Sequence, residues 1–170
     1  MRIRAARAAE VPRLRTMDLD AGLVFRDIGM PEVAEFEPRS VEELEESRQA
    51  GGLWVAAGED DAPASFLMTI PVDGCLHVEQ LSTDPASARQ GLGRALLDFA
   101  ADRARADGVP ALTLTTFADV AWNAPYYERC GFRVLRDDEL TPGLRAIRAH
   151  EDALGLDRWP RVCMRRDLTP

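Results

Sequence analysis

The sequence predicts a single α/β domain over residues 1–170, in which a largely antiparallel sheet is combined with helices. Three observations support this fold class. Helical and strand patterns alternate along the chain, three apolar strands follow one another with only short turns between them, and a glycine-rich loop opens an amphipathic helix directly after the third strand. With 170 residues, 46% of them hydrophobic, the chain can bury a substantial core without disulfides or a metal.

The first part of the chain is predicted to form one strand and two helices. Residues 2–6 have the pattern of a strand, and residues 9–27 carry apolar side chains at nearly helical spacing, which predicts one helix. Ser40 and Glu43 match the capping-box pattern, so a second helix is expected over residues 41–49.

Three consecutive strands are expected to lead into the glycine-rich loop. Their short polar turns, such as the Asp-Gly pair at 73–74, are typical of hairpins, so this part of the sheet should be an antiparallel meander. The three strands cover residues 53–57, 64–72 and 75–83.

The last part of the chain is predicted to alternate helices and strands. The helix over residues 91–107 has one apolar face, and an extra helix over 143–154 either covers a substrate pocket or elaborates the surface. The remaining elements are strands over residues 111–115, 132–136 and 161–166, and a short helix within the segment that precedes the second of these strands.

Composition limits the class of protein. The net charge of −8 argues against a nucleic-acid partner and favours a cationic substrate. The three cysteines match neither a secreted disulfide framework nor a Cys-x-x-Cys metal pair, so we expect a reducing, cytoplasmic setting and no metal. No apolar stretch approaches the length of a membrane span, and we expect no membrane association.

The most informative segment is the loop after the third meander strand, which carries Gly91 and Gly93 at the start of a helix. Glycines let the backbone come close to a ligand, and the unpaired N–H groups of a helix's first turn attract phosphate oxygens. A P-loop is excluded because the chain has no lysine, and a dinucleotide fingerprint is excluded because Leu96 stands where its third glycine belongs.

This loop resembles the acyl-CoA loop of the GNAT superfamily of N-acyltransferases, written Gln/Arg-x-x-Gly-x-Gly/Ala. Gly91 and Gly93 match the motif, whereas Ala88 stands at its leading Gln/Arg position. The contact of that side chain must therefore come from elsewhere, for example from Arg89, or be absent. Alternatively, the glycines only ease a tight turn at the start of the helix.

A second segment resembles the other GNAT signature, a short helix with a tyrosine four residues before a Gly-Phe pair. Tyr127 is that tyrosine, and Gly131 and Phe132 are the pair. Asn123 is a candidate N-cap of this helix, and Gly131 can adopt the left-handed conformation that ends it. The resemblance is strong over residues 52–136 and rests on pattern alone outside them.

The resemblance implies the GNAT-type fold, an α/β fold with a mixed, mostly antiparallel, splayed sheet and helices on both of its faces. It also implies an N-acetyltransferase in which the amine of a small-molecule acceptor directly attacks acetyl-CoA, and it allows a homodimer. Two alternatives stay open. The acceptor can be a protein N-terminus or lysine, or the chain can be a CoA-binding regulatory module that has kept the fold without the chemistry.

The resemblance also implies which residues bind acetyl-CoA. The loop should hold the pyrophosphate, and the backbone of the preceding strand should bond the pantetheine arm where parallel strands splay apart. The predicted cofactor-binding residues are Leu81, Thr83, Ala88, Arg89, Gln90, Gly91, Leu92, Gly93, Arg94, Asn123 and Tyr127.

Three residues are candidates for catalysis. Tyr127 would protonate the departing thiolate, or would merely pack against the pantetheine arm. Glu79 would deprotonate the amine through water, and His77 is the rival base because imidazole titrates nearer neutrality. Both residues can instead be ordinary strand side chains that pair with each other or face solvent.

Overall fold

The computed structural model describes residues 1–168. Their strands form a seven-stranded sheet in the order β1-β2-β3-β4-β5-β7-β6. The β4–β5 pair is parallel, while β1–β2, β2–β3, β5–β7 and β6–β7 are antiparallel. The strands are β1 (Arg2–Ala5), β2 (Leu53–Ala57), β3 (Pro63–Val72), β4 (Cys75–Thr83), β5 (Ala111–Phe117), β6 (Arg133–Val134) and β7 (Arg161–Asp167). The predicted mixed, mostly antiparallel sheet is confirmed.

Helices connect these strands. They are α1 (Val11–Gly22), α2 (Pro31–Ala34), α3 (Val41–Gln49), α4 (Leu92–Ala106), α5 (Ala124–Arg129) and α6 (Pro142–Ala153), with 3-10 turns at Ala8–Glu10, Leu23–Ile28, Pro85–Ser87, Asp137–Glu139 and Leu156–Arg158. The predicted single helix over 9–27 is wrong. The α-helical part ends at Gly22, a poor helix former, and a 3-10 segment continues to Gly29, which is left-handed at φ 77°.

The chain forms two compact units. The first comprises Met1–Thr69 and Gln80–Phe99, and the second comprises Ile70–Glu79 and the chain from Ala100 onward. The strands β3 and β4 and the helix α4 therefore each contribute residues to both units. One domain over the whole chain stays a prediction.

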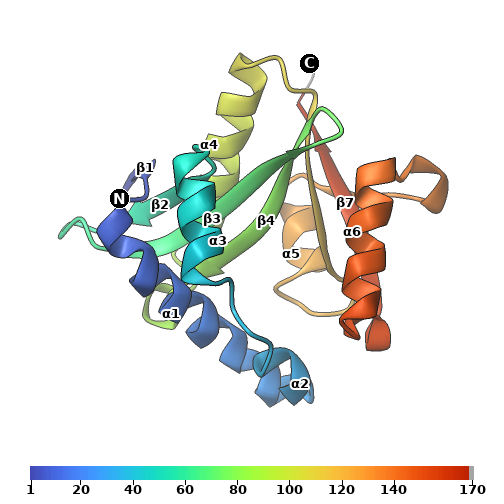
Figure 1. Cartoon of the computed structure of the whole chain (residues 1–170), viewed down its shortest axis with the longest axis horizontal. Coiled ribbons are helices and arrows are strands. Elements are labelled where there is room, and N and C mark those ends of the chain that lie inside the picture. Colours follow the sequence, from blue (N-terminus) through green and yellow to red (C-terminus); the bar gives the residue numbers. More distant parts are fainter. Residues whose placement is uncertain (169–170) are drawn as a thin grey trace. The chain divides into compact units, whose positions relative to one another are not determined.

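The first unit has helices on both faces of its strands. On one face, α1 and α3 lie over β2 and β3 (Figure 1). Their side chains form a buried cluster with those of the two strands; the cluster is Ala6, Val11, Leu14, Met17, Leu44, Leu53, Val55, Phe66 and Met68. Trp54 lies between Leu53 and Val55 on β2, and its ring meets Phe99 of α4 edge-on at 5.0 Å. Because successive strand residues point to opposite faces, α4 covers the other face.

The second unit also carries helices on both faces of its strands. On one face, Leu144 of α6 packs with Leu135 and Cys163, and α6 lies alongside β7 in Figure 1. On the opposite face, Gly131 at the end of α5 lies close to the Arg166 side chain. A Cβ added at Gly131 would be 3.5 Å from the Arg166 Nε.

The remaining boundaries follow the predictions with small corrections. The hairpin turn at Asp73–Gly74 has positive φ at both residues, as a type I′ turn requires. The strand predicted over 111–115 extends to Phe117 because β7 pairs with it along its whole length, and the strand predicted over 132–136 shrinks to Arg133–Val134. The extra helix is confirmed as α6.

Candidate functional site

The loop between β4 and α4 lies in the first unit, and hydrogen bonds and an ion pair of Asp84 hold its first residues in place. The Asp84 side chain accepts a hydrogen bond from the Ala86 N–H at 3.0 Å. The backbone N–H of Asp84 donates to the Ala64 carbonyl at 2.9 Å. An ion pair joins the Asp84 carboxylate to Arg13 of α1. The loop then turns through left-handed conformations at Arg89 (φ 62°) and Gly91 (φ 76°).

The first turn of α4 presents backbone donors. The earliest hydrogen bond of the helix runs from the Ala95 N–H to the Gly91 carbonyl at 3.0 Å. Within residues 1–168, no backbone acceptor takes the N–H groups of Leu92, Gly93 and Arg94. Gly91 is exposed, and a Cβ added there would meet nothing within 4 Å. This geometry suits a phosphate group, which needs unpaired donors and close backbone approach.

The side chains around this turn differ in whether they have an ion-pair partner. Ala88, Arg89 and Gln90 are exposed. The Arg89 guanidinium makes no hydrogen bond or ion pair in the described part of the chain, whereas Arg94 lies 4.0 Å from the Asp98 carboxylate. Arg89 is therefore available to an anionic ligand.

The end of β4 is held by Ser65 of β3. The Ser65 hydroxyl lies 2.9 Å from the Ser82 carbonyl and 2.9 Å from the Thr83 hydroxyl. Leu81 and Thr83 are half-buried. These hydrogen bonds fix the strand segment whose backbone is predicted to bond the pantetheine arm.

The second unit contains the start of β4 and its parallel neighbour β5. The two strands pair at Leu76 with Leu112 and at His77 with Thr113, and within this unit the pairing does not continue to Val78 or beyond. The strands therefore separate after His77, as a splayed sheet requires.

His77 and Glu79 lie on β4 at positions that share one face of an ideal strand. His77 is 2% exposed, and its Nδ1 lies 2.9 Å from the Thr113 hydroxyl. Glu79 is half-buried. The His77 ring is thus enclosed and tied to β5, which favours the interpretation of this histidine as an ordinary strand side chain.

Asn123 begins α5 but does not cap it with its side chain. Its backbone has φ −111° and ψ −116°, far from the extended conformation of a capping residue, and its side chain makes no cap hydrogen bond. The predicted capping role is therefore wrong. The Asn123 Oδ1 is instead buried without a hydrogen-bond partner within residues 1–168.

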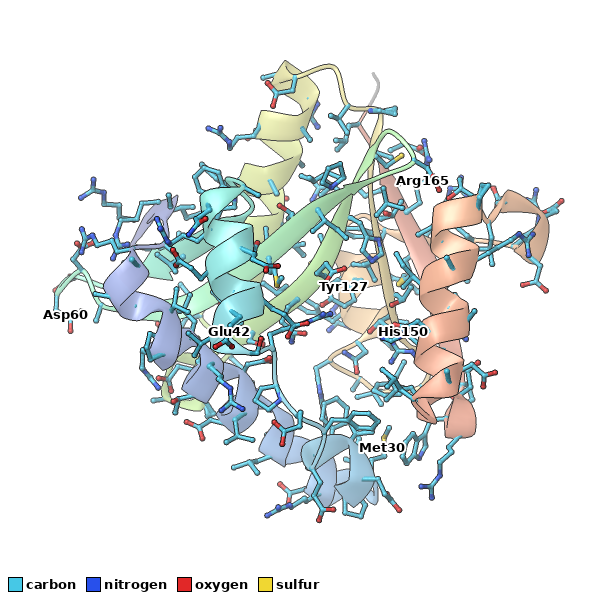
Figure 2. All side chains as sticks on the ribbon, in the orientation of Figure 1. Met30, Glu42, Asp60, Tyr127, His150 and Arg165 are labelled. Carbon is cyan, nitrogen blue, oxygen red and sulfur yellow. The ribbon has the colours of Figure 1, made fainter. Side chains whose placement is uncertain are left out.

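Tyr127 lies on α5 (Figure 2), half-buried between two other rings. Its ring meets Tyr126 at 5.4 Å and Phe132 at 5.8 Å, both edge-on. Burial, and to a lesser extent Cys130, raises the pKa of the Tyr127 phenol above its ordinary value of 10. The phenol is therefore neutral throughout the physiological range, and its hydroxyl can donate a hydrogen bond or a proton.

Sequence reasoning missed two polar clusters. In the first unit, the Asp18 carboxylate of α1 accepts a hydrogen bond from Ser82 of β4. In the second, Glu151 of α6 accepts hydrogen bonds from Thr115 and Arg161. The signal for Asp18 was present, because it lies four residues after the core residue Leu14 and hence on the inward face of α1.

Within residues 1–168, no group of three or more His, Cys, Asp or Glu side chains is arranged to hold a metal ion. None of the helices described is both long and apolar enough to cross a bilayer.

Solved structures show the same fold. An acetyltransferase of the GNAT family from Staphylococcus aureus matches 99% of this chain and 99% of its own, at 14% identity and a TM-score of 0.73. The PaiA N-acetyltransferase of Thermoplasma acidophilum, solved with coenzyme A, matches over 98% of both chains at 16% identity and a TM-score of 0.73.

A longer protein contains the fold as one part. N-acetylglutamate synthase from Neisseria gonorrhoeae, solved with coenzyme A and N-acetylglutamate, matches 99% of this chain at 18% identity and a TM-score of 0.74. This chain spans only 35% of the length of that synthase.

The sequence itself matches a family model. The model of the acetyltransferase (GNAT) family covers residues 23–132, which is more than half of the 170 residues. The covered segment includes the glycine loop and the Tyr127 helix described above. The chain therefore belongs to the GNAT family of acetyltransferases.

Proposed function

We propose that the protein transfers the acetyl group of acetyl-CoA to a primary amine of a small molecule. The observation that carries this proposal is the first turn of α4, where unpaired N–H groups and the exposed, left-handed Gly91 form an open anion cradle. Two of the similar structures were solved with coenzyme A, which supports a CoA pyrophosphate as the anion.

The cofactor would be held by the residues that the resemblance singles out. Gly91 to Arg94 offer N–H groups to the pyrophosphate, and the unpaired Arg89 guanidinium replaces the side chain that Ala88 lacks. The backbones of Leu81 and Thr83 bond the pantetheine arm. The buried Asn123 Oδ1 has no hydrogen-bond partner in the described part of the chain, so we assign Asn123 the role of accepting a hydrogen bond from an N–H group of the cofactor.

The reaction would join the amine nitrogen to the acyl carbon and break the carbon–sulfur bond. Glu79 takes the proton of the amine, because His77 is enclosed and tied to Thr113. The departing thiolate has an ordinary pKa near 8.5, below that of the Tyr127 phenol, so full proton transfer from Tyr127 is uphill. Tyr127 therefore stabilises the thiolate chiefly by donating a hydrogen bond.

A panel of acceptors tests this function. Purified protein is incubated with acetyl-CoA and either small primary amines or peptides with free N-termini and lysines, and free CoA and acetylated products are quantified. Faster acetylation of small amines is expected. Turnover with peptides alone would show a protein acetyltransferase, and CoA binding without any turnover would show a regulatory module.

A matched pair of variants tests the role of Tyr127. Tyr127→Phe is expected to lower kcat by about 10²-fold while CoA affinity changes little, because the ring contacts persist and only the hydroxyl is lost. Tyr126→Phe removes the neighbouring hydroxyl and serves as the control. Equal kcat values for the two variants, when chemistry limits the rate, would leave Tyr127 with a packing role only.

A further inference from the structure

The helix α1 carries a carboxylate on the face that it turns toward the sheet. Leu14 and Met17 on this face are fully buried in the first unit's core, and Asp18 follows them. The Asp18 side chain is half-buried, and this burial raises its pKa above the ordinary value. A carboxylate in such a place needs partners, because burying an unpaired charge is costly.

Neutral groups supply the hydrogen bonds that Asp18 receives. The Ser82 hydroxyl lies 2.9 Å from the Asp18 Oδ1, and the Gln80 Nε2 donates to the same hydroxyl at 2.9 Å. Because Ser82 accepts from Gln80, its own proton is directed at Asp18. The Asp18 Oδ2 accepts from the Arg39 backbone N–H at 3.3 Å.

No cation neutralises this carboxylate directly. The guanidinium groups of Arg39 and Arg15 lower its pKa only through space: the Arg39 guanidinium lies 3.8 Å from Glu43, and Arg15 pairs with Glu37 at 3.2 Å. Within residues 1–168, Asp18 has no ion pair. Two hydrogen bonds leave the carboxylate with spare acceptor capacity.

The position of Asp18 relates it to the proposed cofactor path. Its partner Ser82 lies on β4 between Leu81 and Thr83, the residues whose backbones we propose to bond the pantetheine arm. The chain's net charge of −8 also favours a positively charged ligand.

We propose that Asp18 binds a second, non-reacting ammonium group of the acceptor, so that the preferred substrate is a diamine or polyamine. This inference rests on the proposed function. The bound group must be one that does not react, because a carboxylate beside an ammonium favours its charged form and would keep a reacting amine protonated. One ammonium therefore anchors the substrate at Asp18 while the other amine loses its proton and attacks.

The test compares straight-chain diamines of three to six carbons with monoamines of the same lengths. Wild type is expected to have a lower KM for diamines. Asp18→Asn should raise the diamine KM at least about 10-fold, equivalent to about 1.4 kcal/mol, and leave the monoamine KM and both kcat values within about twofold. Asp20→Asn, on the same helix, is the matched control.

A second readout needs no turnover. Calorimetry measures diamine binding to the CoA-bound protein, where loss of affinity is expected for Asp18→Asn and not for Asp20→Asn. Equal effects of Asp18→Asn on diamines and monoamines, or no effect on either, would overturn the anchor. Wild-type protein that acetylates no amine would instead overturn the proposed function, and the anchor with it.

Substitution of Ser82, the hydrogen-bond partner of Asp18, gives a further test. It should change the pH dependence of diamine affinity, which would stay the same if Asp18 had a purely structural role. Ser82→Ala removes the hydrogen bond that favours the charged carboxylate, while Arg15, Arg39 and the neutral Gln80 remain in place. The acidic pH at which diamine affinity is lost should therefore move upward. An unchanged profile for the diamine would contradict the anchor.

Discussion

Gly91 combines two separate demands on one residue. Its φ of 76° disfavours any side chain with a Cβ, and the open space beside it is where we place the pyrophosphate. A substitution there therefore acts through backbone strain and through the ligand, and the two effects need to be separated.

Gly51 allows that separation, because it has φ 78° and also nothing within 4 Å of an added Cβ. Gly91→Val and Gly51→Val should destabilise the fold to similar extents. Only Gly91→Val should weaken CoA binding, by an order of magnitude or more, measured by calorimetry on folded protein. Equal CoA affinity of the two variants would contradict the placement of the pyrophosphate.

Glu79 and His77 are distinguished by their pH dependence. Glu79→Gln is expected to lower kcat/KM by about 10²-fold or more and to remove the acidic limb of its pH profile, whereas His77→Gln should keep that limb. Because the free amine also titrates, the profile is repeated with acceptors of different pKa, which move only the amine's own limb. The reverse pattern would identify His77 as the base.

Local chemistry decided how well individual residues could be predicted. The Ser40 cap is confirmed, with the Ser40 hydroxyl accepting from the Glu43 N–H, because both partners lie within one helical turn. The Asn123 cap is wrong because the loop before α5 imposes a different backbone conformation. Asp18 needed its partner Ser82, which is 64 residues away in sequence, so no local pattern could reveal the hydrogen bond.

At the scale of elements, α6 is held to the sheet by charge as well as by apolar packing. Glu151 is 13% exposed and accepts hydrogen bonds from Thr115 at 2.6 Å, from Arg161 at 2.8 Å and from Arg148 at 3.0 Å. Arg161 is 8% exposed and also lies 4.5 Å over the Phe117 ring. The Glu151 carboxylate therefore balances an enclosed guanidinium.

Glu151→Gln should destabilise the protein by about 2 kcal/mol, because it leaves the Arg161 charge uncompensated in an enclosed place. Asp102→Asn is the control: Asp102 pairs with Arg105 at 2.7 Å, but its side chain is 78% exposed, and such pairs contribute little. Urea unfolding measures both changes. A Glu151→Gln variant as stable as Asp102→Asn would show that apolar packing alone holds α6.

Elements with strong periodicity were predictable, and junctions between elements were not. The amphipathic helices α3, α4 and α6 lie within two residues of their predicted bounds. The division of residues 9–27 depends on how Gly22 and the exposed residues after it are accommodated, and hydrophobic spacing alone does not report this. The short β6 likewise depends on its pairing with β7.

At the scale of the whole molecule, most shifted carboxylates favour stability at neutral pH. Hydrogen bonds from arginine side chains or backbone N–H groups lower the pKa values of Glu10, Glu45, Asp61, Glu139 and Asp167. A carboxyl whose pKa is lower in the folded state stabilises the fold above its unfolded pKa, and this contribution is lost as the pH falls through the folded value. Acid should therefore weaken the fold.

Asp18 should act in the opposite direction. Its pKa is raised in the folded state, chiefly by burial, so the folded protein binds its proton more tightly than the unfolded chain does. The contribution of Asp18 to the free energy of unfolding therefore grows as the pH falls from neutrality through the folded pKa, and levels off below the unfolded value near 3.9. Asp18→Asn cannot titrate, and it keeps every other carboxylate.

The free energy of unfolding of Asp18→Asn is subtracted from that of wild type. This difference separates the contribution of Asp18 from the general loss of stability in acid. Free energies of unfolding are measured by urea titration at a series of pH values between about 4 and 7. Wild type is expected to gain stability relative to Asp18→Asn as the pH falls. If this difference in stability stays constant, or if wild type becomes less stable than Asp18→Asn on acidification, then Asp18 is not a half-buried carboxylate held without a cation. The gain would mark Asp18 as a residue whose charge costs stability at neutral pH, which is the pattern expected of a group kept for binding.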